Sequence, residues 1–237
     1  MRTIGAAPGN AVHILFQGIG MRLAGAPVGY CTVALITTAT GRTILVDTGV
    51  HQTREMVLAG LREHGLTPAG VDHVVLTHLH FDHCENAGLF HPAEVIVHTD
   101  EIAEARAHPA RDPYLADFWP ELLERSRLTV MTGAVLELGE SVRVHHLPGH
   151  RHGQLAVSVP TTEGLVVCSS DVAKNARELL LGSPPVSDPV MADAARASVE
   201  WVRRTADIVV PGHDRILTLR DTVPQWHDDQ EILFTIY

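Results

Sequence analysis

Cysteine is scarce in this chain. Its 237 residues include three cysteines, Cys31, Cys84 and Cys168, and no two of them have CxxC spacing. They give no disulfide framework, which favours the reducing environment of the cytoplasm. Cys31 and Cys168 lie in apolar runs, and Cys84 follows a histidine. We expect all three to be small buried side chains that pack and bind no metal.

Long apolar segments are also lacking. The N-terminus shows no charged region followed by an extended apolar one, and the apolar stretch 12–16 is too short for a signal peptide. No stretch approaches the ~20 apolar residues that a membrane-spanning helix needs. These absences predict a soluble, cytoplasmic protein without a membrane partner.

Basic residues are outnumbered. Eighteen lysines and arginines face 28 acidic residues, giving a formal charge of −10. The resulting field repels a polyanion, which argues against a nucleic-acid partner and favours a small-molecule substrate. Divalent cations held by the protein would offset part of this charge. Whether the chain forms a homodimer is left open by its sequence.

Short β-branched runs alternate with helical stretches along the chain, which is 45% hydrophobic. No linker divides it, so we predict one domain over residues 1–237. Helices are expected at 51–64 and at 188–204, where Asp188 and Pro189 form a start signal. Two segments are expected to border a pocket, a glycine-rich loop at 18–29 and an aromatic loop or short-helix insertion at 108–120. Strands are expected at 12–16, 32–37, 43–46, 74–77, 95–98, 128–131, 142–146, 155–159, 165–168 and 208–210. This alternation predicts an α/β layered fold.

The segment VVLTHLHFDH at residues 74–83 carries the strongest functional signal. A buried strand ends there, and His78, His80, Asp82 and His83 supply four ligand-type side chains within six residues. Imidazole and carboxylate groups suit zinc and other first-row divalent metals. Packed in a core without a metal, each would need another polar partner. The segment therefore predicts a metal site.

Three further candidates lie far along the chain. His150 follows a Pro-Gly turn, Asp171 ends an apolar strand, and His213 follows a second Pro-Gly turn. Each is a weak signal alone. Their shared position at strand ends favours convergence, because ligands of open α/β sheets gather at one edge.

In this order, HxHxDH followed by a distant His, Asp and His resembles the metallo-β-lactamase superfamily. The sequence ILVDTG at 44–49 is similar to that family's first motif, whose aspartate supports the metal ligands from behind. That role falls to Asp47. The resemblance implies an αβ/βα sandwich, in which two facing mixed sheets carry outer helices and the site lies at one edge.

The resemblance also implies two divalent cations. We expect zinc, with iron or manganese as alternatives, and a bridging hydroxide that attacks the carbonyl of a small ester or lactone. Asp82 would serve catalysis as well as metal binding, and Asp171 would bridge because a carboxylate has two oxygens. The ligands of the first metal would be His78, His80 and His150, and those of the second Asp82, His83 and His213, with Asp171 shared.

Four residues are candidates for handling the substrate. Lys174, the only lysine in the chain, stands three residues after Asp171, where the acyl-homoserine lactonases that this chain resembles carry a tyrosine. It would stabilise oxyanion charge or bind a carboxylate, or else be an exposed cation. Arg177, Phe81 and Tyr114 are possible substrate contacts, and each has an ordinary surface or packing role as its alternative.

One turn departs from the family pattern. The usual PGHTPG is replaced by Pro-Gly-His-Arg-His-Gly at 148–153, so Arg151 and His152 stand beside a predicted ligand. They would either reshape the rim of the site or lie in solvent.

Other activities remain as alternatives. A mononuclear iron dioxygenase acting on a persulfide would use the first set of ligands alone. A phosphodiesterase of the same fold is a second alternative, although no basic face is evident. Relatives with di-iron redox chemistry carry a carboxylate where this chain has His80, so the histidine favours hydrolysis.

Overall fold

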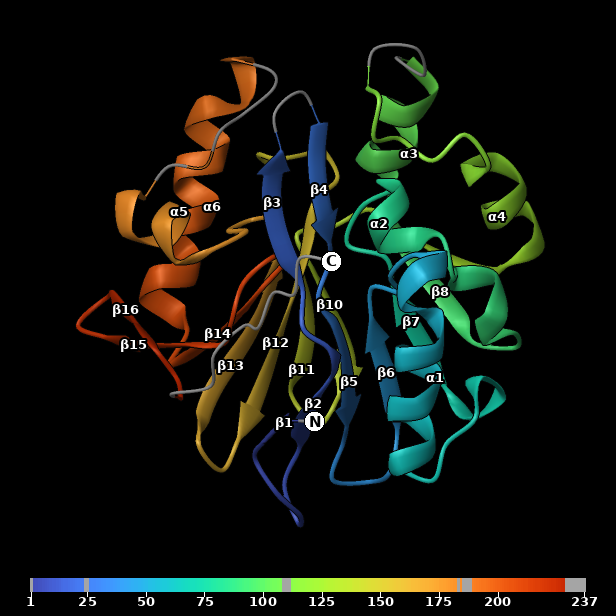
Figure 1. Cartoon of the computed structure of the whole chain (residues 1–237), viewed down its shortest axis with the longest axis horizontal. Coiled ribbons are helices and arrows are strands. Elements are labelled where there is room, and N and C mark those ends of the chain that lie inside the picture. Colours follow the sequence, from blue (N-terminus) through green and yellow to red (C-terminus); the bar gives the residue numbers. More distant parts are fainter. Residues whose placement is uncertain (1, 24–25, 108–111, 183, 185–188, 229–237) are drawn as a thin grey trace.

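The computed structural model describes residues 2–23, 26–107, 112–182, 184 and 189–228. Two seven-stranded sheets face each other, and helices cover the outer face of each (Figure 1). The first sheet has the order β1 (Arg2–Ile4), β2 (Ala11–Phe16), β5 (Val33–Thr37), β6 (Thr43–Val46), β7 (His73–Val75), β8 (Glu94–His98), β9 (Arg127–Met131). The second has the order β10 (Val135–Gly139), β11 (Val142–His146), β12 (Leu155–Thr161), β13 (Gly164–Ser170), β14 (Ile208–Pro211), β15 (Leu217–Arg220), β16 (Val223–Trp226).

Both sheets are mixed. Strands β6 to β9 pair in parallel, and so do β13 and β14, whereas the other neighbours are antiparallel. Parallel strands need a crossover, and helices supply it. The connections contain α1 (Arg54–Glu63), α2 (Phe81–Cys84), α3 (Thr99–Ala107) and α4 (Trp119–Arg125) beside the first sheet, and α5 (Ala176–Leu181) and α6 (Ala192–Thr205) beside the second. The strand ends that carry the predicted ligands thus come to one edge.

The core has three layers of apolar contacts, which explains why the strands read as continuous apolar runs. Ile36 of the first sheet and Val157 of the second meet between the sheets. Leu35, the neighbour of Ile36, faces the other way and packs with Val57 and Leu61 of α1. Alternation along β5 therefore fills both of its faces, because both faces are covered.

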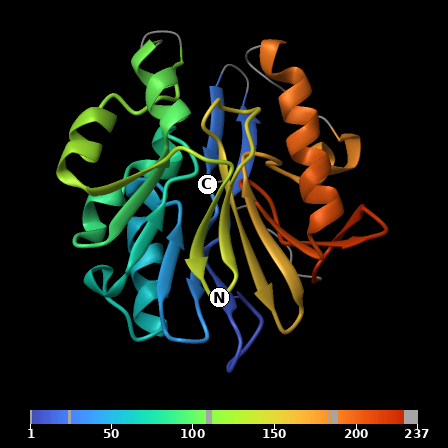
Figure 2. The ribbon, with the colours of Figure 1, turned by 180° about the vertical axis from the view of Figure 1, so that it is seen from behind.

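The third layer lies between the second sheet and the helices α5 and α6. Val199 and Val202 of α6 pack there with Val167 and Val209 of the sheet. Seen from behind, α6 and α1–α4 lie on opposite sides of the paired sheets (Figure 2). This arrangement confirms the predicted α/β sandwich.

Within the described ranges, no helix is long and apolar enough to cross a membrane.

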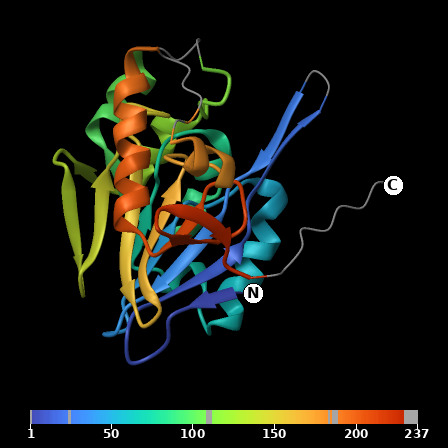
Figure 3. The same cartoon turned by 90° about the vertical axis from the view of Figure 1, so that its left-hand side faces the viewer.

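The segment 18–29 differs from expectation. It is a β-hairpin of β3 (Ile19–Leu23) and β4 (Ala26–Tyr30), which projects beyond the sheets (Figure 3). Its glycines suggested a loop, but they allow the hairpin backbone to approach His213. A Cβ added at Gly20 would lie 3.4 Å from the Cβ of His213, and one at Gly29 would lie 3.6 Å from its Nδ1.

Two other expected segments have different bounds in the structure. A 3₁₀ turn, Pro189–Met191, precedes α6, which begins at Ala192; Asp188 lies outside the described residues. In the expected loop or short-helix insertion at 108–120, residues 108–111 also lie outside them, and α4 begins at Trp119. Trp119 is buried in the core, whereas Tyr114 is partly exposed.

The layered core predicts a large difference between two leucine substitutions. Leu35→Ala removes a fully buried side chain and should lower the free energy of unfolding by about 2–5 kcal/mol. Leu180→Ala, at an exposed position of α5, should change it by less than about 0.5 kcal/mol. Urea unfolding followed by circular dichroism measures both. Equal effects would contradict this assignment of the core.

Candidate metal centre

All seven predicted ligands meet at one edge of the sandwich. Residues 78–83 follow β7, Asp171 follows β13, His213 follows β14, and His150 lies in the turn between β11 and β12. The ligand atoms form overlapping groups in which all lie within 4.8 Å of one another. Segments from residue 78 to residue 213 thus converge on a buried cluster of histidines and aspartates.

The first group joins His78, His80 and His150. The Nε2 of His150 lies 3.2 Å from the Nδ1 of His80. The ring of His78 meets each of the other two edge to face, at centroid distances of 4.5 and 5.0 Å. Three imidazoles with converging nitrogens form the kind of face that binds zinc.

The second group joins Asp82, His83 and His213. The Oδ2 of Asp82 lies 3.5 Å from the Nε2 of His83 and 3.6 Å from the Nε2 of His213. The Nδ1 of His213 donates a hydrogen bond to the backbone carbonyl of Tyr30, at 3.0 Å. This bond leaves the Nε2 free to face the group.

Asp171 lies between the two groups and contacts both. Its Oδ2 is 3.3 Å from the Nε2 of His150, in the first group. Its Oδ1 is 3.2 Å from the Nε2 of His213 and 3.5 Å from that of His83, in the second. One carboxylate therefore presents one oxygen to each group, as a bridging ligand would.

The chemistry of these side chains fits a metal. The Nε2 of His78 and the Oδ1 of Asp171 are buried and lack hydrogen-bond partners. Burial, together with the neighbouring histidines, holds the pKa of His78 well below its usual value, so this imidazole is neutral, as a ligand must be. Burial alone would raise the pKa of Asp171, but His213, Lys174 and His83 hold it well below its usual range. Buried polar atoms without hydrogen-bond partners, such as the Nε2 of His78 and the Oδ1 of Asp171, cost free energy unless a cation binds them.

The pKa of His83 is shifted in the opposite direction from that of His78. Burial alone would lower its pKa, but Asp82 and other surrounding groups raise it well above its usual value. A metal bound to this imidazole would compete with a proton, so metal uptake should release protons.

Asp47 lies behind the cluster and contacts one of its histidines and the strand ends. Its Oδ2 accepts hydrogen bonds from the Nδ1 of His83 at 2.8 Å and from the hydroxyl of Ser170 at 3.0 Å. Its Oδ1 accepts one from the backbone N–H of Thr77 at 2.9 Å. Asp47 and Ser170 both have left-handed backbone conformations, with φ of 57° and 46°. Three strand ends are thereby joined to one carboxylate.

The three cysteines are buried, as expected. Cys31 lies with Asp47 and His83, on the side of His83 away from the ligand cluster. Burial raises the pKa of the Cys31 thiol to about 12, so it remains protonated at neutral pH. A neutral thiol is a poor metal ligand, which supports the predicted packing role.

Lys174 is part of the cluster. Its Nζ lies 3.2 Å from the Nδ1 of His150 and 3.5 Å from the Oδ2 of Asp171. Its backbone carbonyl also accepts a hydrogen bond from the N–H of His213, at 2.8 Å. By contrast, Arg177 is exposed in the first turn of α5, and no hydrogen bond or ion pair joins it to the described part of the chain. Of the two predicted cations, only Lys174 touches the metal ligands.

Two aromatic residues form a rim beside the first group. Phe81 and Tyr114 are both partly exposed, and their rings stack with centroids 6.5 Å apart. The ring of Tyr114 also lies 5.6 Å from that of His80. Both residues therefore lie beside the predicted first group.

Arg151 is neither in solvent nor at the rim. It is 5% exposed and forms ion pairs with Glu101, Glu104 and Asp112 behind the first group. The sequence analysis missed this because the acidic partners lie in α3 and in the segment after it. The replacement of threonine by arginine in the turn was the available signal.

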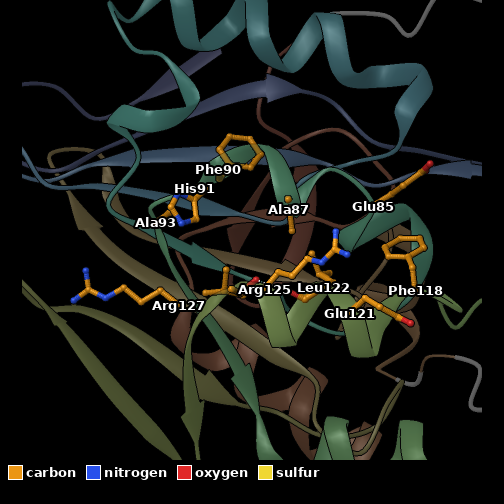
Figure 4. A pocket seen from close by; sticks show the side chains of 13 residues that line it. Glu85, Ala87, Phe90, His91, Ala93, Phe118, Glu121, Leu122, Arg125 and Arg127 are labelled. Carbon is orange, nitrogen blue, oxygen red and sulfur yellow. Dashed lines mark hydrogen bonds between the residues drawn. The ribbon is translucent and has the colours of Figure 1, made fainter.

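A separate cleft of about 400 Å³ lies among η3 (Ala87–Phe90), β8 and α4 (Figure 4). Phe90, Leu122 and Phe118 line it together with Arg125. None of the seven predicted ligands is among its lining residues within the described chain. We therefore assign the candidate site to the histidine cluster and not to this cleft.

Facing sheets with a histidine and aspartate cluster at one edge fit a metal-dependent hydrolase, and the sequences of known proteins agree with this class. Residues 26–213 match the sequence model of the metallo-beta-lactamase superfamily. Metallo-beta-lactamase domain-containing protein 1 of Xenopus laevis is 30% identical over 210 residues, which cover 86% of this chain and 79% of the frog protein. The chain therefore belongs to the metallo-β-lactamase superfamily and is a metal-dependent hydrolase.

Lactonases are also among its relatives. The N-acyl homoserine lactonase of Bacillus thuringiensis is 26% identical over 157 residues, which cover 65% of this chain and 60% of the lactonase. The crystal structure of a variant of the B. thuringiensis protein AiiA, with N-decanoyl-L-homoserine at its active site, superposes with a TM-score of 0.67 at 20% identity. It covers 86% of this chain and 92% of AiiA.

The close packing around Asp171 predicts sensitivity at a neighbouring glycine. A Cβ at Gly212 would lie 2.3 Å from the Oδ1 of Asp171, so Gly212→Ala should displace this carboxylate. We expect metal affinity to fall about 10–100-fold, as for other residues that orient ligands. Gly88→Ala is the matched control, because nothing lies within 4 Å of its added Cβ. Competition with a chromophoric chelator measures both, and equal affinities would contradict the packing argument.

Proposed function

We propose that this protein is a dinuclear hydrolase of small esters or lactones. His78, His80 and His150 would hold one divalent cation, Asp82, His83 and His213 the other, and Asp171 would bridge them. The observation that carries this proposal is the contact of Asp171 with both groups, one oxygen to each. Zinc is the proposed metal, because imidazole nitrogen and carboxylate oxygen are ligands that it accepts readily.

Two cations in these positions would lower the pKa of a water molecule to near neutrality and polarise a substrate carbonyl. The protein's own groups supply the surroundings. Asp171 is held ionised, and Asp47 and Tyr30 orient two of the histidines. The carboxylate of Asp82 lies near the Nε2 atoms of both His83 and His213. For this reason its proposed role includes catalysis as well as metal binding.

Lys174 is the proposed substrate-binding cation. An ammonium group only donates hydrogen bonds, so its contact with His150 requires an Nδ1 without a proton. When a neutral imidazole binds a metal through Nε2, the proton is on Nδ1. The two contacts exclude each other, and metal binding would release the ammonium group from His150. It would then be available to a carbonyl oxygen or a carboxylate of the substrate.

The rim and the relatives support an acyl substrate. Phe81 and Tyr114 offer a partly exposed apolar surface next to His80, suited to the carbon chain of an ester or lactone. The similarity to N-acyl homoserine lactonase points the same way. The formal charge of −10 argues against a nucleic acid as the substrate.

The second group of ligands favours the dinuclear proposal over a mononuclear dioxygenase. A mononuclear iron dioxygenase needs only the first group, yet Asp82, His83 and His213 are all in place around Asp171. Metal content and substrate use test this directly. We expect two zinc ions per chain, hydrolysis of lactones or aryl esters, and loss of activity on chelation that zinc restores. One iron per chain with oxygen consumption, or hydrolysis of phosphodiesters alone, would refute the proposal.

The position of Lys174 predicts a catalytic defect with intact metal binding. Lys174→Ala should lower kcat by about 100-fold, the order found when one oxyanion donor is removed. Zinc content, measured by mass spectrometry, should remain that of the parent protein. Arg204→Ala removes an exposed cation of α6 and should leave both quantities unchanged. Parental turnover in Lys174→Ala would remove this residue from the mechanism.

A further inference from the structure

Asp112 connects a predicted metal ligand to a buried arginine. Its Oδ2 accepts a hydrogen bond from the Nε2 of His80 at 2.9 Å and another from the Nη1 of Arg151 at 2.5 Å. Neither contact involves the face of His80 that carries Nδ1, which points at His150. The carboxylate thus lies behind the ligand, on the side opposite the first group.

Arg151 is held rigidly in this position. Its Nε donates to the Oε1 of Glu101 at 3.1 Å, and its Nη1 also pairs with Glu104 at 3.3 Å. Glu101 is fully buried, and its Oε1 accepts the backbone N–H of Leu79, between the first two histidines, at 2.9 Å. The turn that carries Arg151 packs tightly on α3, since a Cβ at Gly153 would lie 2.2 Å from the backbone nitrogen of Glu101. An arginine fork that pairs with several carboxylates loses little freedom on forming these bonds.

The hydrogen bond to Asp112 determines which ring nitrogen of His80 carries the proton. A neutral imidazole has one N–H and one bare nitrogen, and the partner of the N–H determines which is which. Because Asp112 accepts only, the proton of His80 is on Nε2 and the bare Nδ1 faces the first group. A carboxylate behind a metal-binding histidine also makes the imidazole more basic and fixes its orientation.

The other oxygen of Asp112 holds the aromatic rim. Its Oδ1 accepts the backbone N–H of Tyr114 at 3.0 Å. Tyr114 in turn accepts the N–H of Phe81 at 2.8 Å through its carbonyl, and Leu79 accepts that of Ala116 at 3.1 Å. The segment after Asp112 is therefore bonded along the ligand-bearing segment, next to His80.

We propose that Asp112, clamped by Arg151, is a positioning residue that sets the affinity of the first metal and joins that metal to the aromatic rim. The proposal rests on the dinuclear site proposed above. It adds a residue that sets the affinity for only one of the two metals. Because Asp112 does not contact the second group, its removal should leave zinc affinity at that group unchanged.

The test is metal affinity in variants that isolate each group. In a His213→Ala background the first group is complete and the second is not, and Asp112→Ala should weaken zinc binding there about 10–100-fold. In a His150→Ala background, Asp112→Ala should leave zinc affinity unchanged. Asp117→Ala is the matched control, because it removes an exposed carboxylate from the same segment. Asp112→Asn keeps the size and an acceptor for His80 but loses the charged pair with Arg151, so its effect should be smaller than that of Asp112→Ala.

Chelator competition gives the affinities, and thermal unfolding of the metal-free proteins shows that each variant folds. If Asp112→Ala does not fold, Asp112→Asn replaces it in both backgrounds. Equal effects of the Asp112 and Asp117 substitutions, or equal weakening in both backgrounds, would overturn the proposal. Failure to hydrolyse any ester or lactone with the zinc affinities behaving as expected would refute the proposed function and leave this inference standing. A parent protein that binds no divalent metal would overturn both.

Discussion

The contact of one ionised carboxylate, that of Asp171, with imidazoles from both groups is the interaction on which the rest of the site depends. It requires the ends of β13 and β14 to meet closely, and Gly212 permits this because any side chain there would collide with the carboxylate. It also requires the end of β13 to turn sharply, which Ser170 does in a left-handed conformation. Asp47 then ties this turn to the first sheet, through Thr77 and His83.

The charge distribution follows from the same requirement. The buried histidines and aspartates satisfy one another only in part, since the Nε2 of His78 and the Oδ1 of Asp171 lack hydrogen-bond partners. A purely structural cluster would be expected to pair all its polar atoms. The excess of ligating capacity, in a chain already rich in acidic residues, explains why divalent cations are the natural complement of this edge. The single lysine of the chain lies there as well, within 3.5 Å of Asp171.

Much of this could be predicted from the sequence, for physical reasons. The ten expected strands are all present with small differences in their bounds, because most of their residues are apolar and buried. The strands that were missed are the edge strands β1, β10 and β16, the neighbouring strand β15 and the hairpin β3–β4, where partial exposure or glycine removes the apolar pattern. The placement of the seven ligands was predictable because each follows a strand. The partnership of Arg151 with Asp112 was not, since 39 residues separate them and only the fold brings them together.

The hairpin β3–β4 has a consequence for how such a site can diversify. Gly20 and Gly29 present bare backbone to His213, so this wall of the second group contributes no side chain of its own at these two positions. Neither glycine has a left-handed conformation, and both lie at van der Waals distance from the histidine. Larger residues there would contact His213 and narrow the space beside the predicted second group. The hairpin can therefore change the shape of this wall while the seven predicted ligand residues stay the same.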